Sequence, residues 1–200
     1  MNTIDELSSA LARLPGIGPR QAKRFVYYLL TVSESDRATL AALIQDLGNH
    51  VHQCRACMRF FASPTKDICN YCADRSRDDS LLMIVEKDQD LGAIERAGTY
   101  KGRYFVLGGV LTLTGKGAIR EKDLTRVLED RIKAGLKEVV LATSATSEGE
   151  HTADHIRLML APYRELIAVS QLGRGLATGS ELEYSDAETL RAALSNRRQA

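Results

Sequence analysis

The chain has 200 residues, 44% of them hydrophobic, and a formal net charge of +1 at pH 7. This length allows one domain or two small ones, and the apolar content is sufficient for a real core. The longest apolar runs, such as Leu81 to Val85, are far too short to span a bilayer, and the N-terminus lacks the apolar stretch of a signal peptide. We therefore expect no membrane contact.

Positive charge is concentrated in two places. Residues 13–24 contain four basic side chains and no acidic one, and residues 54–77 contain five basic and two acidic side chains. The global charge does not indicate a nucleic-acid-binding protein. Its distribution, however, places the basic groups near the N-terminus and around the cysteines described below.

Three helices are predicted within the first 53 residues. They cover residues 3–13, the segment from Pro19 to about Leu30, and a segment that follows Ser35. Apolar residues at helical spacing predict the inward faces of the last two helices. These residues are Ala22, Phe25, Val26 and Leu29 in the second helix, and Leu40, Leu43, Ile44, Leu47 and Val51 in the third.

The turn between the first two helices reads L-P-G-I-G-P and is typical of a helix–hairpin–helix. Gly16 and Gly18 allow a tight turn and a close approach to a flat partner, because they carry no Cβ. Arg20, Lys23 and Arg24 lie on the first turns of the next helix, whose N-terminal amides favour an anion. A DNA phosphate fits these features, and such contacts predict sequence-independent, salt-sensitive binding. The alternative is an ordinary helical hairpin with a solvated basic face.

All four cysteines lie in the pattern C-x₂-C-x₁₁-C-x₂-C. They are Cys54, Cys57, Cys69 and Cys72. This paired spacing is typical of a closed Cys₄ site, whose single Zn²⁺ has a structural role because no position is open to water or substrate. Two disulfides or four unrelated buried cysteines are the alternatives, and His50 and His52 are further candidate ligands. Thiols available for zinc, without an export signal, predict a cytoplasmic protein.

Strands and helices alternate after a charged connector at residues 75–79. Strands are predicted at residues 81–85, 104–107, 138–142 and 166–169, and helices at about 89–97, 122–134 and 152–160. This alternation predicts a parallel sheet with helices on both faces. In the tail we expect a strand near 182–184 and then a short helix that begins with a capping box of Ser185 and Glu188.

Residues 142–150 read A-T-S-A-T-S-E-G-E and resemble the A-T-D-x-D-x-E-G-E stretch of Toprim domains, which occur in topoisomerases and primases. Glu86, at the end of the first predicted strand, matches the Toprim glutamate. In the enzymes this glutamate and two aspartates hold Mg²⁺, but here Ser144 and Thr146 replace the aspartates, and neutral hydroxyls are poor Mg²⁺ ligands. The resemblance implies a Toprim fold without its catalytic metal site. The remaining carboxylates are Glu86, Glu148 and Glu150.

The order of these parts, with a tail that reads R-G-x-x-x-G-x-E-L-E-Y, resembles the RecR family of bacterial recombination mediators over essentially the whole chain. The resemblance implies a protein without catalytic activity that assembles into a ring, usually a tetramer, around single- or double-stranded DNA in the nucleoid. With RecO, and in some settings RecF, such a protein helps to load RecA onto single-stranded gaps coated by SSB. The implied DNA-binding residues are Arg20, Lys23 and Arg24 near Gly16 and Gly18, the zinc ligands are the four cysteines, and the acidic partner surface comprises Glu86, Glu148 and Glu150.

The expected architecture is a multi-module α+β chain. Residues 1–53 form the helix–hairpin–helix domain, 54–77 the Cys₄ zinc finger, 78–174 the Toprim α/β domain, and 175–200 an oligomerisation tail. The family usually has Asn-Pro at Ser144-Ala145, a proline near Ala177, and more glycines and a proline in the loop from Gly115 to Arg120. The alternative functions are an Mg²⁺-dependent Toprim nuclease or primase-like enzyme, and a zinc-ribbon adaptor that does not touch DNA.

Overall fold

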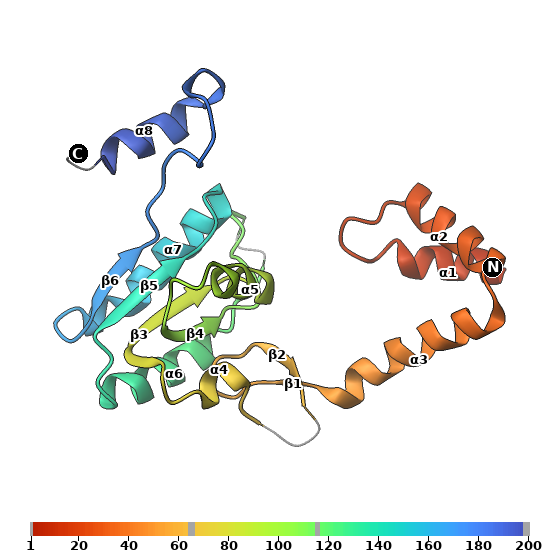
Figure 1. The fold of residues 1–200 in the computed structure, drawn as a ribbon, viewed down its shortest axis with the longest axis horizontal. Coiled ribbons are helices and arrows are strands. Elements are labelled where there is room, and N and C mark those ends of the chain that lie inside the picture. The colour runs from red at the N-terminus through yellow and green to blue at the C-terminus, as the bar shows by residue number, and fades with distance from the viewer. Residues whose placement is uncertain (1, 64–66, 115–116, 198–200) are drawn as a thin grey trace. The chain divides into compact units, whose positions relative to one another are not determined.

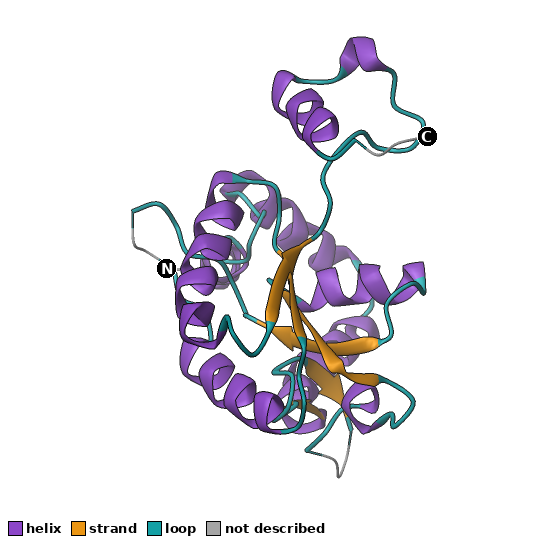
Figure 2. Ribbon diagram, turned by 90° about the vertical axis from the view of Figure 1, so that its left-hand side faces the viewer, coloured by secondary structure: helices purple, strands orange, loops and turns teal. Residues whose placement is uncertain are grey.

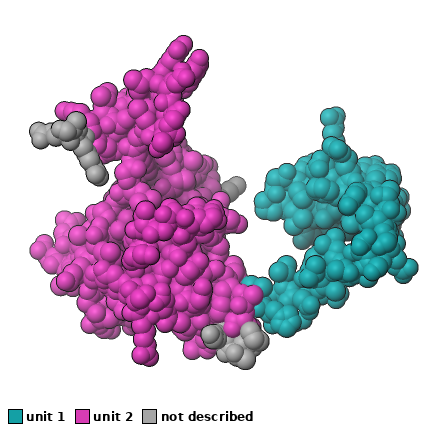
Figure 3. Space-filling view, in the orientation of Figure 1, with its two compact units in different colours: residues 1–51 teal, residues 52–200 magenta. Residues whose placement is uncertain are grey.

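The computed structural model describes residues 2–63, 67–114 and 117–197. The chain divides into two compact units, residues 1–51 and residues 52–200, which are coloured separately in Figure 3. The first two residues of the loop from Gly115 to Arg120, in which the chain departs from the family pattern, lie outside the described residues. No described helix is both long enough and apolar enough to cross a bilayer.

Unit 1 contains three helices (Figure 1). They are α1 (Thr3–Leu11), α2 (Pro19–Thr31) and α3 (Glu34–His50). Asn2 caps α1 by accepting the N–H of Asp5 at 2.9 Å, and Ser33 caps α3 by accepting the N–H of Asp36 at 3.1 Å. The three predicted helices are confirmed to within two residues at their N-termini. Val51 does not continue α3, as its apolar spacing predicted, because it begins a strand.

Few apolar side chains of unit 1 are buried. Ala22 and Val26 of α2 are enclosed as predicted, but Phe25 is 37% exposed. The prediction that α3 has an inward-facing apolar side is also wrong, because the large apolar side chains of this helix are 44–62% exposed. Three short helices expose too much surface relative to their volume to cover two apolar faces. The exposed residues of α3 are Leu40, Leu43, Ile44 and Leu47.

The segment with the cysteines contains a small two-stranded sheet and one short helix. These are β1 (Val51–Gln53), β2 (Phe60–Ala62) and α4 (Asn70–Ala73). We call residues 52–73 the cysteine module. It belongs to the same compact unit as the larger sheet that follows.

That larger sheet has four parallel strands in the order β4-β3-β5-β6. The strands are β3 (Asp78–Val85), β4 (Gly102–Val106), β5 (Glu138–Ala142) and β6 (Ala168–Gln171), and the helices between them are α5 (Asp88–Ala97), α6 (Glu121–Lys133) and α7 (Ser147–Leu160). Ile84, near the carboxyl end of β3, lies beside Phe105 of β4 and Leu141 of β5. The predicted parallel sheet is confirmed.

Alternate side chains of β3 enter two separate cores. Leu82 and Ile84 pack in a cluster with residues of α6 and α7, whereas Met83 and Val85 pack in a second cluster with Leu91 of α5. Helices therefore cover both faces of the sheet, as predicted (Figure 2). The carboxyl ends of the strands point to the loops that carry Glu86 and residues 143–146.

The tail differs from its prediction in two details. It contains one short 3₁₀ turn, η2 (Leu182–Tyr184), and the helix α8 (Ala187–Ser195), whereas the other 3₁₀ turn, η1 (Ala161–Tyr163), directly follows α7. Residues 182–184 do not form the predicted strand, because no described strand lies beside them to supply hydrogen bonds. The cap of α8 is Asp186 rather than Ser185, because Asp186 Oδ1 accepts the N–H groups of Glu188 and Thr189, both at 2.9 Å.

Candidate functional sites

The turn between α1 and α2 presents open backbone. Gly16 has a φ of 77°, which favours glycine, and a Cβ at Gly16 or Gly18 would meet no described atom within 4 Å. Gly18 is the N-cap of α2 and Pro19 occupies its first turn. Among the described residues no side chain caps this helix, so its first-turn amides are available to an external acceptor.

Three basic side chains follow this turn on one side of α2. Arg20, Lys23 and Arg24 are all exposed, whereas Ala22 and Val26 face the helix packing. The arrangement places three exposed cationic side chains beside uncapped amides and a turn that contains two glycines. It can bind an anion whose surface is flat and extended, such as a nucleic-acid backbone.

The four cysteine sulfur atoms come together in the cysteine module. All of them lie within 4.8 Å of one another, and the Cys57 and Cys69 sulfurs are 3.6 Å apart. Four sulfurs around an ion at about 2.3 Å would be separated by about 3.8 Å, so one tetrahedrally bound ion fits this cluster. Disulfides are excluded in this structure because the four cysteines are free. His50 and His52 do not belong to the cluster.

Backbone hydrogen bonds hold each cysteine pair in a tight turn. The N–H of Met58 donates to the Cys54 carbonyl at 2.8 Å, and Met58 itself has a φ of 62°. In the second pair, the N–H groups of Cys72 and Ala73 donate to the Cys69 carbonyl at 3.1 and 2.9 Å. Hydrogen bonding with the other three sulfurs, that of Cys54 first, and burial raise the pKa of the Cys57 thiol. A bound cation is what would keep all four sulfurs as thiolates.

The cysteine module packs directly on the edge of the four-stranded sheet. The N–H of Val106 in β4 donates to the Cys57 carbonyl at 2.8 Å, and Arg103 in the same strand donates to the carbonyls of Tyr71 and Cys72 at 3.0 and 3.1 Å. Arg120, which precedes α6, donates to the Met58 carbonyl at 3.1 Å. Sequence reasoning missed these contacts, because they join residues 30 or more positions apart.

The carboxylate of Glu86, at the position of the Toprim glutamate, is already hydrogen-bonded within the protein. This side chain is 6% exposed, and one of its oxygens accepts both the N–H of Ser144 at 2.8 Å and the Ser144 hydroxyl at 2.7 Å. Thr146, at the second replaced aspartate, caps α7 by accepting the N–H of Gly149 at 3.1 Å. This cap explains why α7 begins five residues before its predicted start.

The other acidic residues of this stretch do not complete a metal site. Glu150 forms an ion pair with Arg174 and accepts a hydrogen bond from the Gln171 amide at 3.2 Å. Within the described residues, the cysteines form the only group of three or more acidic, histidine or cysteine side chains that could hold a metal ion. Glu86, Glu148 and Glu150 therefore do not converge on a cation position. The serine in place of aspartate was the sequence signal for this outcome.

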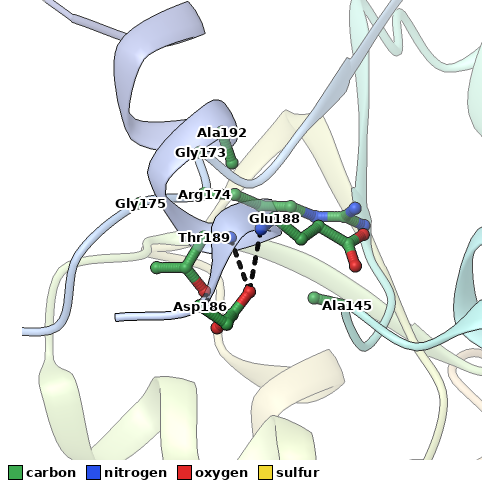
Figure 4. Close-up of a pocket in the computed structure, with 8 residues that line it drawn as sticks. All are labelled: Ala145, Gly173, Arg174, Gly175, Asp186, Glu188, Thr189 and Ala192. Atoms are coloured by element: carbon green, nitrogen blue, oxygen red, sulfur yellow. Dashed lines mark hydrogen bonds between the residues drawn. The ribbon is translucent and has the colours of Figure 1, made fainter. Parts of the chain in front are cut away.

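A cavity of about 430 Å³ lies between the tail and the loop that follows β5 (Figure 4). Two of its charged side chains already have structural roles, since Arg174 pairs with Glu150 and Asp186 caps α8. The Asn196 side chain donates to the Arg174 carbonyl at 2.8 Å and ties the end of α8 to the start of the tail. The lining residues are Ala145, Gly173, Arg174, Gly175, Asp186, Glu188, Thr189 and Ala192.

Comparisons with known proteins cover almost the whole chain. Family models match residues 4–47 (RecR, helix-hairpin-helix), 80–172 (Toprim domain) and 175–198 (RecR, C-terminal). A protein named Recombination protein RecR from Parvibaculum lavamentivorans is 40% identical over 195 residues, which cover 98% of this chain and 96% of the relative. Proteins of the same name from Dehalococcoides mccartyi and Cutibacterium acnes are each 36% identical, over 97% of this chain and 93% and 94% of the relatives.

Proposed function

Because the chain belongs to the RecR family of recombination proteins, we propose that it is a DNA-binding recombination mediator without catalytic activity of its own. It acts with RecO, and in some settings RecF, to load RecA onto single-stranded gaps coated by SSB. It binds single- and double-stranded DNA without sequence preference. Its place of action is the nucleoid in the cytoplasm.

The hairpin between α1 and α2 is the observation that carries the DNA-binding part of the proposal. Exposed Arg20, Lys23 and Arg24 adjoin a turn whose glycines leave the backbone open. Phosphates fit this surface because cations and helix amides both favour anions, and contacts to phosphates carry no information about the base sequence. The DNA contacts are therefore independent of sequence.

An apolar groove in unit 1 supports self-association. It has a volume of about 340 Å³ and is lined almost entirely by apolar side chains of α1, α2 and α3. Exposed apolar surface of this kind is costly unless a partner covers it. A homo-oligomeric ring, which we propose to be a tetramer, would cover it and bring several weakly basic hairpins to one DNA molecule, where linked sites raise the effective concentration.

The Toprim loops support a non-catalytic role. Glu86 accepts two hydrogen bonds from Ser144, and Glu150 forms an ion pair with Arg174. Mg²⁺ would have to displace these interactions in order to bind the two carboxylates. We propose that the acidic surface with Glu86, Glu148 and Glu150 contacts protein partners instead. The cysteine module holds one structural Zn²⁺ through Cys54, Cys57, Cys69 and Cys72, whose sulfurs fit a tetrahedral ion.

The DNA-binding proposal is tested with the double variant Arg20→Ala/Arg24→Ala. Binding of gapped and duplex oligonucleotides is measured by fluorescence anisotropy at low and moderate salt, for the parent and for a charge-matched control, Lys122→Ala/Lys133→Ala, whose exposed cations lie on α6. We expect the hairpin variant to lose at least tenfold in affinity and the control to keep the parent affinity. Equal binding by all three proteins would remove the hairpin from the DNA contact.

Two further measurements separate this proposal from its alternatives. Nicked and single-stranded DNA are incubated with Mg²⁺ or Mn²⁺, and cleavage or synthesis that disappears in Glu86→Ala would favour the Toprim enzyme. Mass measurement with and without DNA tests the ring. A monomer at every concentration, with no change on DNA addition, would contradict a clamp. The zinc-ribbon adaptor would then be the remaining alternative.

A further inference from the structure

We propose that Arg103 and Arg131 supply the counter-charge of the metal-loaded cysteine centre and thereby make zinc binding the step that locks the cysteine module onto the sheet. The inference rests on the zinc proposed above and goes beyond it, because it assigns a role to two residues outside the cysteine pattern. Zn²⁺ bound by four thiolates carries two net negative charges. A buried centre of that charge needs cations nearby.

The two arginines are cations with too few acidic partners of their own. The side chains of Arg103 and Arg131 are 8% and 16% exposed, and both rely on one carboxylate, that of Asp79. Asp79 lies 2.7 Å from Arg103 Nε and 3.7 Å from Arg131 Nη1, but it is itself 64% exposed. Arg131 Nε is buried and has no hydrogen-bond partner among the described residues. Two nearly enclosed guanidinium groups with one solvated carboxylate leave a surplus of positive charge.

That surplus lies against the cysteines. Arg103 donates to the carbonyls of Tyr71 and Cys72, so its guanidinium adjoins a ligand directly. Burial lowers the pKa of Arg131 and so does the neighbouring charge of Arg103, whereas negative charge at Cys72, Asp79 and Cys57 opposes that change. Arg131 also lines a cleft of about 250 Å³ with Ala56 and Ile68, the neighbours of Cys57 and Cys69. The guanidinium groups thus come from β4 and α6, whereas the negative centre comes from the cysteine module.

Because the positive and negative groups lie on opposite sides of the contact, metal binding is coupled to the docking of the cysteine module on the sheet. Without zinc, the two guanidinium groups on β4 and α6 repel each other, and no negative centre in the cysteine module attracts them. With zinc, the centre attracts both arginines, and the hydrogen bond from Val106 N–H to the Cys57 carbonyl is protected. Residues outside the ligand shell that act in this way change metal affinity by about 10- to 100-fold.

The test compares zinc affinity of full-length variants by competition with a chromophoric chelator. We expect Arg131→Met to lose about 10- to 100-fold in affinity, Arg131→Lys to keep most of it because the charge remains, and exposed Lys133→Met on the same helix to match the parent. Hydrogen exchange at the Val106 amide is followed in parallel. Zinc should slow this exchange in the parent and slow it less in Arg131→Met.

The variant Asp79→Asn tests the inference independently if Arg131→Met does not fold. Asparagine keeps an acceptor oxygen for Arg103 but removes the competing negative charge, so zinc affinity should stay equal or rise. Equal affinity in folded Arg131→Met and the parent, or weaker affinity in Asp79→Asn, would overturn the inference. Absence of zinc binding by the parent would instead remove the proposed zinc site itself, so the two failures are distinguishable.

Discussion

Ser144 donates its backbone N–H and its hydroxyl to the same carboxylate oxygen of Glu86, at 2.8 and 2.7 Å. Ser144 stands where Toprim enzymes have a metal-binding aspartate, and Glu86 is the carboxylate that would share the metal. A single substitution therefore removes one ligand and occupies another. In this chain the two residues form a hydrogen-bonded connection between the ends of β3 and β5.

This connection predicts a stability effect without a functional one. Ser144→Ala removes a hydroxyl donor from a carboxylate that is 6% exposed, so the free energy of unfolding should fall by about 1–3 kcal/mol. Urea denaturation measures the change, with Ser147→Ala, at the exposed first residue of α7, as the control. DNA affinity should stay at the parent value. An unchanged urea midpoint in Ser144→Ala would mean that the bond to Glu86 contributes nothing to the fold.

Two helical glycines should respond oppositely to alanine. A Cβ at Gly149 in α7 would lie 2.1 Å from the Ser144 carbonyl oxygen, whereas at Gly92 in α5 its nearest contact would be the flexible end of Arg96 at 3.6 Å. Gly149→Ala must displace backbone beside Glu86, and we expect a loss of about 1–3 kcal/mol because overpacking strains its surroundings. Gly92→Ala should gain about 0.5–1 kcal/mol from helix propensity. Thermal unfolding of both variants checks the signs, and stabilisation by Gly149→Ala would contradict the close approach.

Glu95 should contribute to acid unfolding. Burial would by itself raise its pKa, but hydrogen bonds from Arg77 and Tyr104 outweigh burial and hold the pKa below the ordinary value of 4.5. A depressed pKa means that this stabilisation is present above the unfolded value and is lost as pH falls through the folded one. Glu95→Gln should therefore be less stable than the parent at pH 7 and show a shallower decline below pH 4.5.

Urea denaturation across the acid range measures this difference. The exposed Glu129→Gln variant on α6 is the control and should follow the parent curve. If Glu95→Gln and the parent decline in parallel below pH 4.5, the ion pair with Arg77 has no share in the acid transition.

Removal of metal should loosen the cysteine module. Metal analysis should give about one zinc per chain, and stripping with a chelator should lower the unfolding temperature, because a metal bound only by the folded state stabilises it. Cys57→Ser should lose the metal, while His52→Ala should keep it since His52 is outside the sulfur cluster. A metal-free protein with parental stability and assembly would contradict a structural ion.

The hairpin also predicts a salt signature. Lys23→Ala removes one candidate phosphate contact, so the slope of log affinity against log salt should become less negative by about 1, equally for unrelated DNA sequences. Titrations at several salt concentrations, on two oligonucleotides of different sequence, measure the slopes. A variant that changes affinity for only one sequence would indicate base reading rather than phosphate contact.

Sequence patterns predicted those features of the fold that depend on neighbouring residues. The helix bounds of α2 follow from Pro19 and the apolar spacing, and the run from Leu81 to Val85 indicated a strand covered on both faces. The sequence patterns gave wrong predictions where an element needs packing or hydrogen bonds from residues that are distant in the sequence. Residues 182–184 have strand-like composition, but no described strand lies beside them. The apolar face of α3 stays exposed because unit 1 is too small to cover it.

The sequence by itself determined the order of the modules, the cysteine spacing and the loss of the Toprim aspartates, because each is written in a few consecutive residues. Only the tertiary structure decided that Ser144 donates to Glu86 and that Arg174 pairs with Glu150. It also decided that Arg103 of β4 and Arg131 of α6 lie against the cysteine module. The residues in each pair are at least 24 positions apart in the sequence. Their energies depend on burial and distance, which arise only when the sheet brings its loops and edge together.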